Sequence, residues 1–353
     1  MNFREIFTPA AVAANWTEVA STQAPYLGAG LFPAKKKAGL DLAWIKGHKG
    51  LPVSLAPSAF DAKARFRDRI GVAKVETEMP FFREGYLLKE KDRQEMLRAQ
   101  SANDPYAAAV IERVFDDARD LISGANVVPE RMIWQLLAPV DGKPGIQIQA
   151  HGVNYLYDYD PDGVWQENNY VALTEATWDN ATTSDPINDL MEMKNAHEAR
   201  TGTKLKYAVM SRKTMNYLMK SEKMKAVILT INPAASVVLT DNIIKQVVSS
   251  VLDLTLVVYG NQYMAEDKTV AQFMPDDVVT LLPEGALGAT WYGTTPEEAD
   301  LMGENSAEVS IVNTGVALTR IVNPHPVNIE LYASEIVLPS FERMDEVAVL
   351  KVV

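Results

Sequence analysis

The sequence contains no cysteine, and this absence excludes several classes of protein. Disulfide-stapled folds, thiolate nucleophiles and cysteine-ligated zinc sites all need that residue, and a reducing cytosol is the simplest folding compartment for a chain without it. Long apolar runs are also missing, since no stretch approaches the roughly 20 apolar residues that a helix needs to cross a bilayer. Residues 1–20 hold no basic segment followed by an apolar one, so no secretory signal is expected.

Histidine is scarce, and the four that occur are spread along the chain at His48, His151, His197 and His325. A zinc or iron site needs several such ligands to converge, and no H-E-x-x-H pair or similar spacing is present. We expect His197, on a polar helix face, and His325, between two prolines, to lie at the surface. No metal site built on histidine is therefore predicted.

Motifs for phosphate binding and nucleophilic catalysis are missing too. Gly28-Ala29-Gly30 lacks the third glycine and the following helix of a dinucleotide site. Neither a G-x-x-x-x-G-K-[ST] loop nor a G-x-S-x-G elbow occurs. Acid pairs such as Asp116/Asp117 are common on exposed faces, and nothing indicates that they converge in a pocket. We expect no catalytic residue, no cofactor and no enzyme activity.

One acidic cluster keeps an enzyme open as an alternative. Asp158-x-Asp160-x-Asp162-Gly163 matches the start of an EF-hand calcium loop, which needs a bidentate acid at its twelfth position. Asn169 stands there instead, Pro161 interrupts the cluster, and the flanks have the pattern of strands. A hairpin turn between two strands is the simpler interpretation. If the chain were a metal-dependent or hydrolytic enzyme, these aspartates would have to form its active site.

Charge is unevenly distributed over a chain of ordinary composition, 47% hydrophobic and 23% charged, with a net charge of −12. Residues 35–98 hold 15 Lys or Arg against 9 Asp or Glu, whereas the remainder holds 19 against 37. A basic segment and an acidic remainder can pair between copies of the same chain, although a solvated basic loop would have the same composition. Specific nucleic-acid recognition is not expected, since no helix-turn-helix, zinc or aromatic stacking signature accompanies the basic residues.

The N-terminal quarter of the sequence has few of the apolar patterns that would form a hydrophobic core of its own. Residues 3–19 predict one helix with a capped start at Thr8-Pro9, and the prolines and glycines between 25 and 39 predict irregular chain. Residues 41–88 predict a long hairpin, with one strand at 42–45 and another near 72–77. Its charged middle, Asp61 to Arg69, has too few apolar residues for a core, and a two-stranded excursion is marginally stable alone. The hairpin would therefore need contact with a neighbouring molecule to be stable.

The rest of the chain mixes helices and strands. Asp104-Pro105 opens a helix of about 20 residues, about 30 Å long, that is predicted to stop at Gly124, with a shorter helix starting at Pro129. Residues 144–175 alternate like strands. The later predictions are a helix from Asp185-Pro186 to Gly202, a strand at 205–210, a helix capped by Ser211, a helix at 242–252, strands at 254–259, 268–274 and 277–282, and mostly strand over 309–353.

This order of segments resembles the HK97-type capsid subunit of tailed bacteriophages, and the chain is similar to the lambda-like major capsid protein E family. The likeness covers nearly the full chain and depends on the order and spacing of several short stretches. These are Leu27–Pro33, Leu42–Lys46, Ser58–Ala62, Pro80–Glu84, Trp178–Asn180, Asp185–Leu190, Asn323-Pro324 and Leu338–Ser340.

The resemblance implies an α+β fold in four parts. They are an N-terminal arm (1–40), an extended E-loop hairpin (41–88), a P-domain (89–180 plus 321–353) with a long spine helix at about 104–123, and a mixed α/β A-domain (181–320). In such subunits the E-loop lies over a neighbouring subunit. The candidate inter-subunit contacts are therefore Asp61, Lys63, Arg65, Phe66, Arg67, Asp68 and Arg69.

The function implied is that of a tailed-phage major capsid protein, which forms hexamers and pentamers and closes into an icosahedral head around double-stranded DNA. The implied partners are its own copies, a scaffolding protein, a portal protein, a decoration protein and, weakly and non-specifically, the packaged DNA, with no membrane. Assembly would take place in the bacterial cytoplasm. A tail tube or decoration subunit is the other structural alternative, against which the long helix and the separate α/β unit argue.

Overall fold

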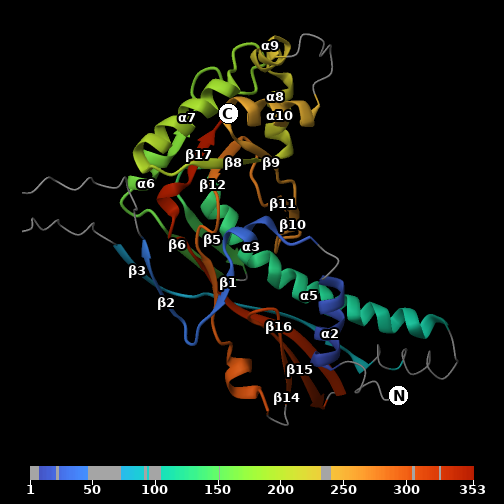
Figure 1. The fold of residues 1–353 in the computed structure, drawn as a ribbon. Coiled ribbons are helices and arrows are strands. Elements are labelled where there is room, and N and C mark those ends of the chain that lie inside the picture. Colours follow the sequence, from blue (N-terminus) through green and yellow to red (C-terminus); the bar gives the residue numbers. More distant parts are fainter. Residues whose placement is uncertain are drawn as a thin grey trace, which may run out of the picture. The chain divides into compact units, whose positions relative to one another are not determined.

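The computed structural model describes residues 8–20, 24–46, 73–90, 94, 105–150, 152–231, 240–303, 307–325 and 327–353 (Figure 1). The chain divides into two compact units. Unit 1 comprises residues 1–43, 76–131 and 288–340, and unit 2 comprises residues 44–75, 132–287 and 341–353. Within the described part, no helix has the length and apolar character to span a membrane.

Unit 1 is built on a six-stranded sheet whose longest strand is β16. The main order is β1-β13-β16-β15-β14, and β4 also pairs with β16. β16 is 14 residues long, so it can pair with β15 and β4 over its first part and with β13 over its last four residues. The strands are β1 (Ala34–Lys36), β4 (Phe81–Leu88), β13 (Ala289–Tyr292), β14 (Ala307–Val312), β15 (Val316–Pro324) and β16 (Val327–Ser340).

Two helices, α2 (Pro9–Ala20) and α5 (Pro105–Leu137), contribute apolar side chains to the core of unit 1. Thr8 caps α2, since its hydroxyl accepts from the backbone N–H of Ala11 at 3.2 Å, which confirms the predicted start at Thr8-Pro9. The predicted beginning at residue 3 lies outside the described residues. The core contains Val12, Trp16, Ala118, Leu121, Ile122, Val312, Val316, Leu318, Leu331 and Ala333.

Helix α5 is longer than the sequence predicted, and the predicted break between 124 and 129 was wrong. It runs for 33 residues with Gly124 and Pro129 inside it. Those residues cost a helix interior about 1 and about 3 kcal/mol relative to alanine. Beyond them the helix buries a run of large apolar side chains, each worth about 1.5–3 kcal/mol, so tertiary packing outweighs local propensity. The buried residues are Met132, Ile133, Trp134, Leu136 and Leu137.

Unit 2 contains a five-stranded mixed sheet in the order β7-β17-β12-β8-β9. β12 is antiparallel to both neighbours, whereas the outer pairs β17–β7 and β8–β9 are parallel. The strands are β7 (Tyr170–Ala172), β8 (Leu205–Met210), β9 (Thr255–Val258), β12 (Val278–Pro283) and β17 (Ala348–Lys351). The larger helices are α7 (Pro186–Thr201), α8 (Arg212–Lys220), α9 (Glu222–Ile231) and α10 (Asp241–Leu252).

The helix ends of unit 2 follow the sequence signals closely. Asp185 caps α7 by accepting from the backbone N–H of Asn188 at 3.3 Å, and Gly202 ends it with a left-handed φ of 73°. Ser211 caps α8 by accepting from the backbone N–H of Thr214 at 3.3 Å. These predictions are confirmed because each depends on residues within one helical turn.

The predicted hairpin over 41–88 is only partly observed. β2 (Asp41–Lys46) pairs with β3 (Ala73–Glu78) in a two-stranded sheet, but β4 leaves the excursion and joins β16. The division into arm, E-loop, P-domain and A-domain stays a prediction. The other elements are α3 (Leu27–Leu31), α6 (Val164–Asn169), the π-helix η1 (Glu297–Leu301), the 3₁₀-helix η2 (Met344–Glu346), and two further two-stranded sheets, β5 (Gly145–Ala150) with β6 (Val153–Asp158) and β10 (Gln262–Met264) with β11 (Val270–Gln272).

His197 is buried, so its predicted surface position was wrong. The buried residues of α7 recur every three or four positions, and His197 continues the series formed by Ile187, Leu190 and Met193. Burial and the nearby charge of Arg200 lower the pKa of His197 to about 4. His325 is exposed, as predicted, while His48 and His151 lie outside the described residues.

This burial predicts an acid-sensitive fold. Because the pKa of His197 is about 4 in the folded chain and about 6.5 when unfolded, the unfolded chain binds the proton first as the pH falls. Stability present above pH 6.5 should therefore decrease toward pH 4, by about 1.4 kcal/mol per pH unit at most. His197→Gln should flatten this part of the profile in urea unfolding measured from pH 7 to 4. Equal pH slopes for the two proteins would contradict this assignment.

Candidate inter-subunit surface

The residues that the sequence singled out for contact between copies cannot be placed in space. Asp61, Lys63, Arg65, Phe66, Arg67, Asp68 and Arg69 all lie outside the described residues. The base of the excursion is described. There Trp44 of β2 packs its ring against Tyr159, with the ring centroids 5.5 Å apart and both side chains buried. The assignment of the seven residues therefore stays a prediction.

The structure shows an acidic surface in unit 1 that the sequence did not single out. The half-exposed ring of Tyr86, on β4, lies near the carboxylates of Asp117, Asp120 and Glu84. Partial burial raises the pKa of Tyr86, and the three negative charges raise it further. We call Glu84, Tyr86, Asp117 and Asp120 the acidic surface.

Helix α5 brings two of these carboxylates to one side because of its buried stripe. Ala118, Leu121 and Ile122 pack into the core of unit 1, which leaves Asp117 partly exposed and Asp120 exposed, beside the exposed Asp116. Like charges three or four residues apart destabilise a helix by about 0.2–0.5 kcal/mol per pair. Arg119 offsets part of this through an ion pair with Asp116 at 3.1 Å. A cation bound at such a cluster would offset the remaining repulsion between the carboxylates.

β4 is held rigidly where it carries the acidic surface. Gly85 lies opposite Tyr332 on β16, and a Cβ at Gly85 would come within 2.7 Å of the Tyr332 Cβ. Glycine therefore allows the close approach of the two strands. The guanidinium of Arg83 lies 4.8 Å from the ring centroid of Phe81 and 5.4 Å from that of Tyr332.

Arg83 also ties β4 to η1. It forms an ion pair with the buried carboxylate of Glu297, which accepts a second hydrogen bond from the Ser334 hydroxyl at 2.8 Å. Two such partners satisfy the buried carboxylate, and removal of either partner would lower the stability of the fold. Arg83 is thus engaged within its own chain, through its ion pair with Glu297.

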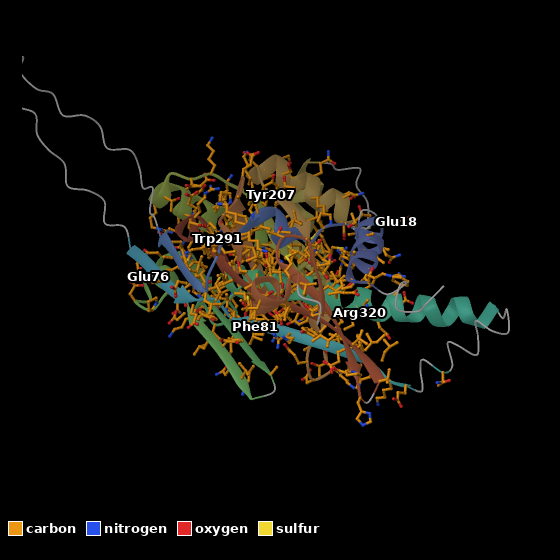
Figure 2. The ribbon with its side chains drawn as sticks, turned by 90° about the horizontal axis from the view of Figure 1, so that it is seen from below. Glu18, Glu76, Phe81, Tyr207, Trp291 and Arg320 are labelled. Atoms are coloured by element: carbon orange, nitrogen blue, oxygen red, sulfur yellow. The ribbon has the colours of Figure 1, made fainter. Side chains whose placement is uncertain are left out.

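Two further ionisable groups lie buried in the same sheet. Arg320 on β15, labelled with Phe81 of β4 in Figure 2, pairs with Glu308 on β14 at 2.9 Å. Burial raises the pKa of Glu335 on β16 well above its ordinary value. That shift favours the protonated form of Glu335, because an ionised carboxylate in apolar surroundings is unfavourable. Neither group reaches the surface, so neither adds to a docking site.

The aspartate cluster at 158–162 serves a structural role. Both carboxylate oxygens of Asp160 accept backbone N–H bonds, from Trp165 at 2.8 Å and Gln166 at 2.9 Å, at the start of α6. Asn169 donates to the carbonyls of Asp345 and Val347 at 3.0 and 2.7 Å. Among the described residues, no three His, Asp or Glu side chains are grouped as a metal site requires. The turn is confirmed, but the predicted hairpin was wrong, because α6 and not a second strand follows it. The observed contacts do not favour the enzyme alternative.

Sequence reasoning missed the acidic surface because its members come from separate segments. The spacing of Asp116, Asp117 and Asp120 on one helix was visible, but such clusters are common on solvated faces. Only the pairing of β4 with β16 brings Glu84 and Tyr86 beside α5. The resulting surface combines carboxylates with an aromatic ring, which suits a basic segment that carries arginine or lysine.

A family model and two solved structures are similar to this chain. The model of the phage major capsid protein E family matches residues 8–352. A putative capsid protein from a prophage of Escherichia coli CFT073 has a TM-score of 0.58 at 14% identity, over 98% of this chain and 99% of that one. A phage-related protein of Bordetella bronchiseptica RB50 has a TM-score of 0.57 at 12% identity, over 98% and 97%. A search of curated protein sequences found no match.

These findings confirm the α+β fold of the HK97-type capsid subunit. They also confirm the structural function, that of a tailed-phage capsid component that associates with its own copies. The chain belongs to the phage major capsid protein E family.

Proposed function

We propose that the chain assembles as hexamers and pentamers into the icosahedral head of a tailed phage, where it acts as a structural protein and not as an enzyme. The observation that carries this proposal is the family match over residues 8–352. The head encloses double-stranded DNA, is assembled in the cytoplasm of the bacterial host, and involves a scaffolding protein, a portal protein and a decoration protein. A net charge of −12 suits a shell that holds DNA through weak, non-specific contacts only.

Contact between copies is proposed to run from the basic segment of one chain to the acidic surface of the next. Lys63, Arg65, Arg67 and Arg69 supply positive charge, and Phe66 supplies an apolar side chain that can pack against the exposed Tyr86. Residues 61–69 carry four Lys or Arg against two Asp, whereas the acidic surface carries three carboxylates around one ring. Complementary charge favours this pairing over contact between like segments.

Deletion of residues 58–69 should separate folding from assembly. The deletion removes the charged middle of the excursion and none of the residues that the structure describes, so the subunit should fold while shells fail to form. Wild-type and deleted chains would be expressed with and without a scaffolding protein and examined by negative-stain electron microscopy, with circular dichroism as the folding control. Normal shells from the deleted chain would refute the E-loop assignment, and a strictly monomeric wild-type chain would refute the proposed function.

Charge reversal offers a sharper test of the proposed partners. Asp117→Lys with Asp120→Lys should raise the concentration needed for assembly at least tenfold, because the basic segment then meets positive charge. Lys63→Glu with Arg65→Glu should do the same. The chain that carries all four changes should assemble again, since each contact between copies then has both charges exchanged. Light scattering over a range of protein concentrations measures all three, with Glu284→Lys, on an exposed bend of unit 2, as the control. Failure of the fourfold variant to recover would rule out this pairing.

A further inference from the structure

The single turn of π-helix η1 places two adjacent carboxylates against two different strands of unit 1. The buried Glu297 forms the ion pair with Arg83 of β4. Glu298 accepts from the ammonium of Lys36 on β1, with both of its carboxylate oxygens 2.6 Å from Nζ. Within the described sheet, β1 pairs with β13 and β4 pairs with β16. Helix η1 therefore connects directly two strands that the sheet joins through β13 and β16.

The chain that enters η1 is packed tightly between β16 and the residues that precede β4. A Cβ at Gly293 would come within 2.7 Å of Cγ2 of Ile336 and 3.1 Å of Cε of Met79. The backbone N–H of Gly293 also donates to the carbonyl of Ile336 at 2.9 Å. Glycine allows this close approach of the backbone. The turn therefore starts from a point that is fixed beside both β16 and the beginning of β4.

The turn is also held by hydrogen bonds of its own. The buried hydroxyl of Thr295 accepts from the backbone N–H of Glu298 at 3.3 Å, and the carbonyl of Thr295 accepts from that of Ala299 at 3.0 Å. The carboxylate of Glu297 accepts from the Ser334 hydroxyl of β16 at 2.8 Å. Short π-helices are rare and occur frequently at functional sites. Both carboxylates are thus carried by one ordered turn, so that movement of one displaces the other.

Two consecutive lysines of β1 make different contacts. The ammonium of Lys35 lies 5.3 Å from the ring centroid of Trp291 on β13, whereas Lys36 binds η1. Successive side chains of a strand point to opposite faces, which explains the difference. The backbone N–H of Lys37 donates to the carbonyl of Tyr292 at 2.8 Å, so the end of β1 is fixed at the same place. Lys35 therefore provides a matched control for substitution of Lys36.

We propose that η1 couples β1 to β4, so that displacement of either strand is transmitted to the other through Glu298 and Glu297. Ion pairs on a rigid element are a physical route for such coupling. Its consequence for assembly rests on the proposed function, because β4 carries the acidic surface. A neighbouring copy that binds the acidic surface would then restrict the motion of β1 as well.

Amide hydrogen exchange on the full chain, below the concentration needed for assembly, tests the coupling. Lys36→Met removes the ion pair with η1, so exchange in β4 should become at least fivefold faster although Lys36 lies on a different strand. Lys35→Met should leave exchange in β4 unchanged. Arg83→Met should give the reciprocal result, with exchange in β1 at least fivefold faster, because coupling between two sites acts equally in both directions.

Conservative variants separate loss of the ion pairs from loss of packing. Lys36→Arg and Arg83→Lys keep the charges and should leave exchange in the other strand within twofold of the wild type. Thermal melts identify any variant that unfolds. In that event Glu298→Gln, which keeps the size of the side chain, should accelerate exchange in both strands.

The outcomes separate this coupling from the proposed function. Faster exchange that is confined to the substituted strand, or equal effects of Lys35→Met and Lys36→Met on β4, would overturn the coupling and leave the proposed function standing. Faster exchange in the other strand from a wild-type background that forms no shells would support the coupling and overturn the proposed function.

Discussion

The antiparallel pairing of β4 with β16 is the interaction on which the rest of unit 1 depends. It joins the strand that leaves the excursion, through eight residue pairs from Phe81↔Ile336 to Leu88↔Ile329, to the longest strand of the sheet. Gly85 makes the close approach to Tyr332 possible, and Arg83 fixes the same strand to the buried Glu297. A slip of one residue would move Tyr86 and Glu84 to the opposite face and dissolve the acidic surface.

The β4–β16 register brings charged residues from separate segments together at the acidic surface. An exposed ion pair contributes only about 0–1 kcal/mol, so a single contact of this kind holds two copies weakly. A shell repeats each contact many times, and repeated weak contacts give strong association while each step stays reversible. In the proposed pairing, residues 61–69 of a chain contact one neighbouring copy while its acidic surface receives residues 61–69 of another. The proposed pairing therefore implies that assembly is sensitive to salt, since exposed pairs are screened.

Local features of this fold could be predicted from the sequence, and features that depend on distant contacts could not. The caps at Thr8, Asp185 and Ser211 were found because each acts within one turn of its helix. The continuity of α5 through Pro129 was missed because burial of the residues beyond it, such as Trp134, decides the outcome. His197 was misplaced although the spacing of Ile187, Leu190 and Met193 marks its face as buried. The acidic surface required the β4–β16 register, which no local pattern encodes.

The pairing of the basic segment with the acidic surface of another copy can be measured directly in assembled particles. Isotopically light and heavy copies would be mixed before assembly and treated with a carbodiimide, which joins lysine to carboxylates in direct contact, and the products identified by mass spectrometry. The account predicts links from Lys63 of one copy to Asp117, Asp120 or Glu84 of another, seen as mixed light–heavy pairs. Links from Lys63 that stay within one copy, or that reach only carboxylates outside the acidic surface, would contradict it.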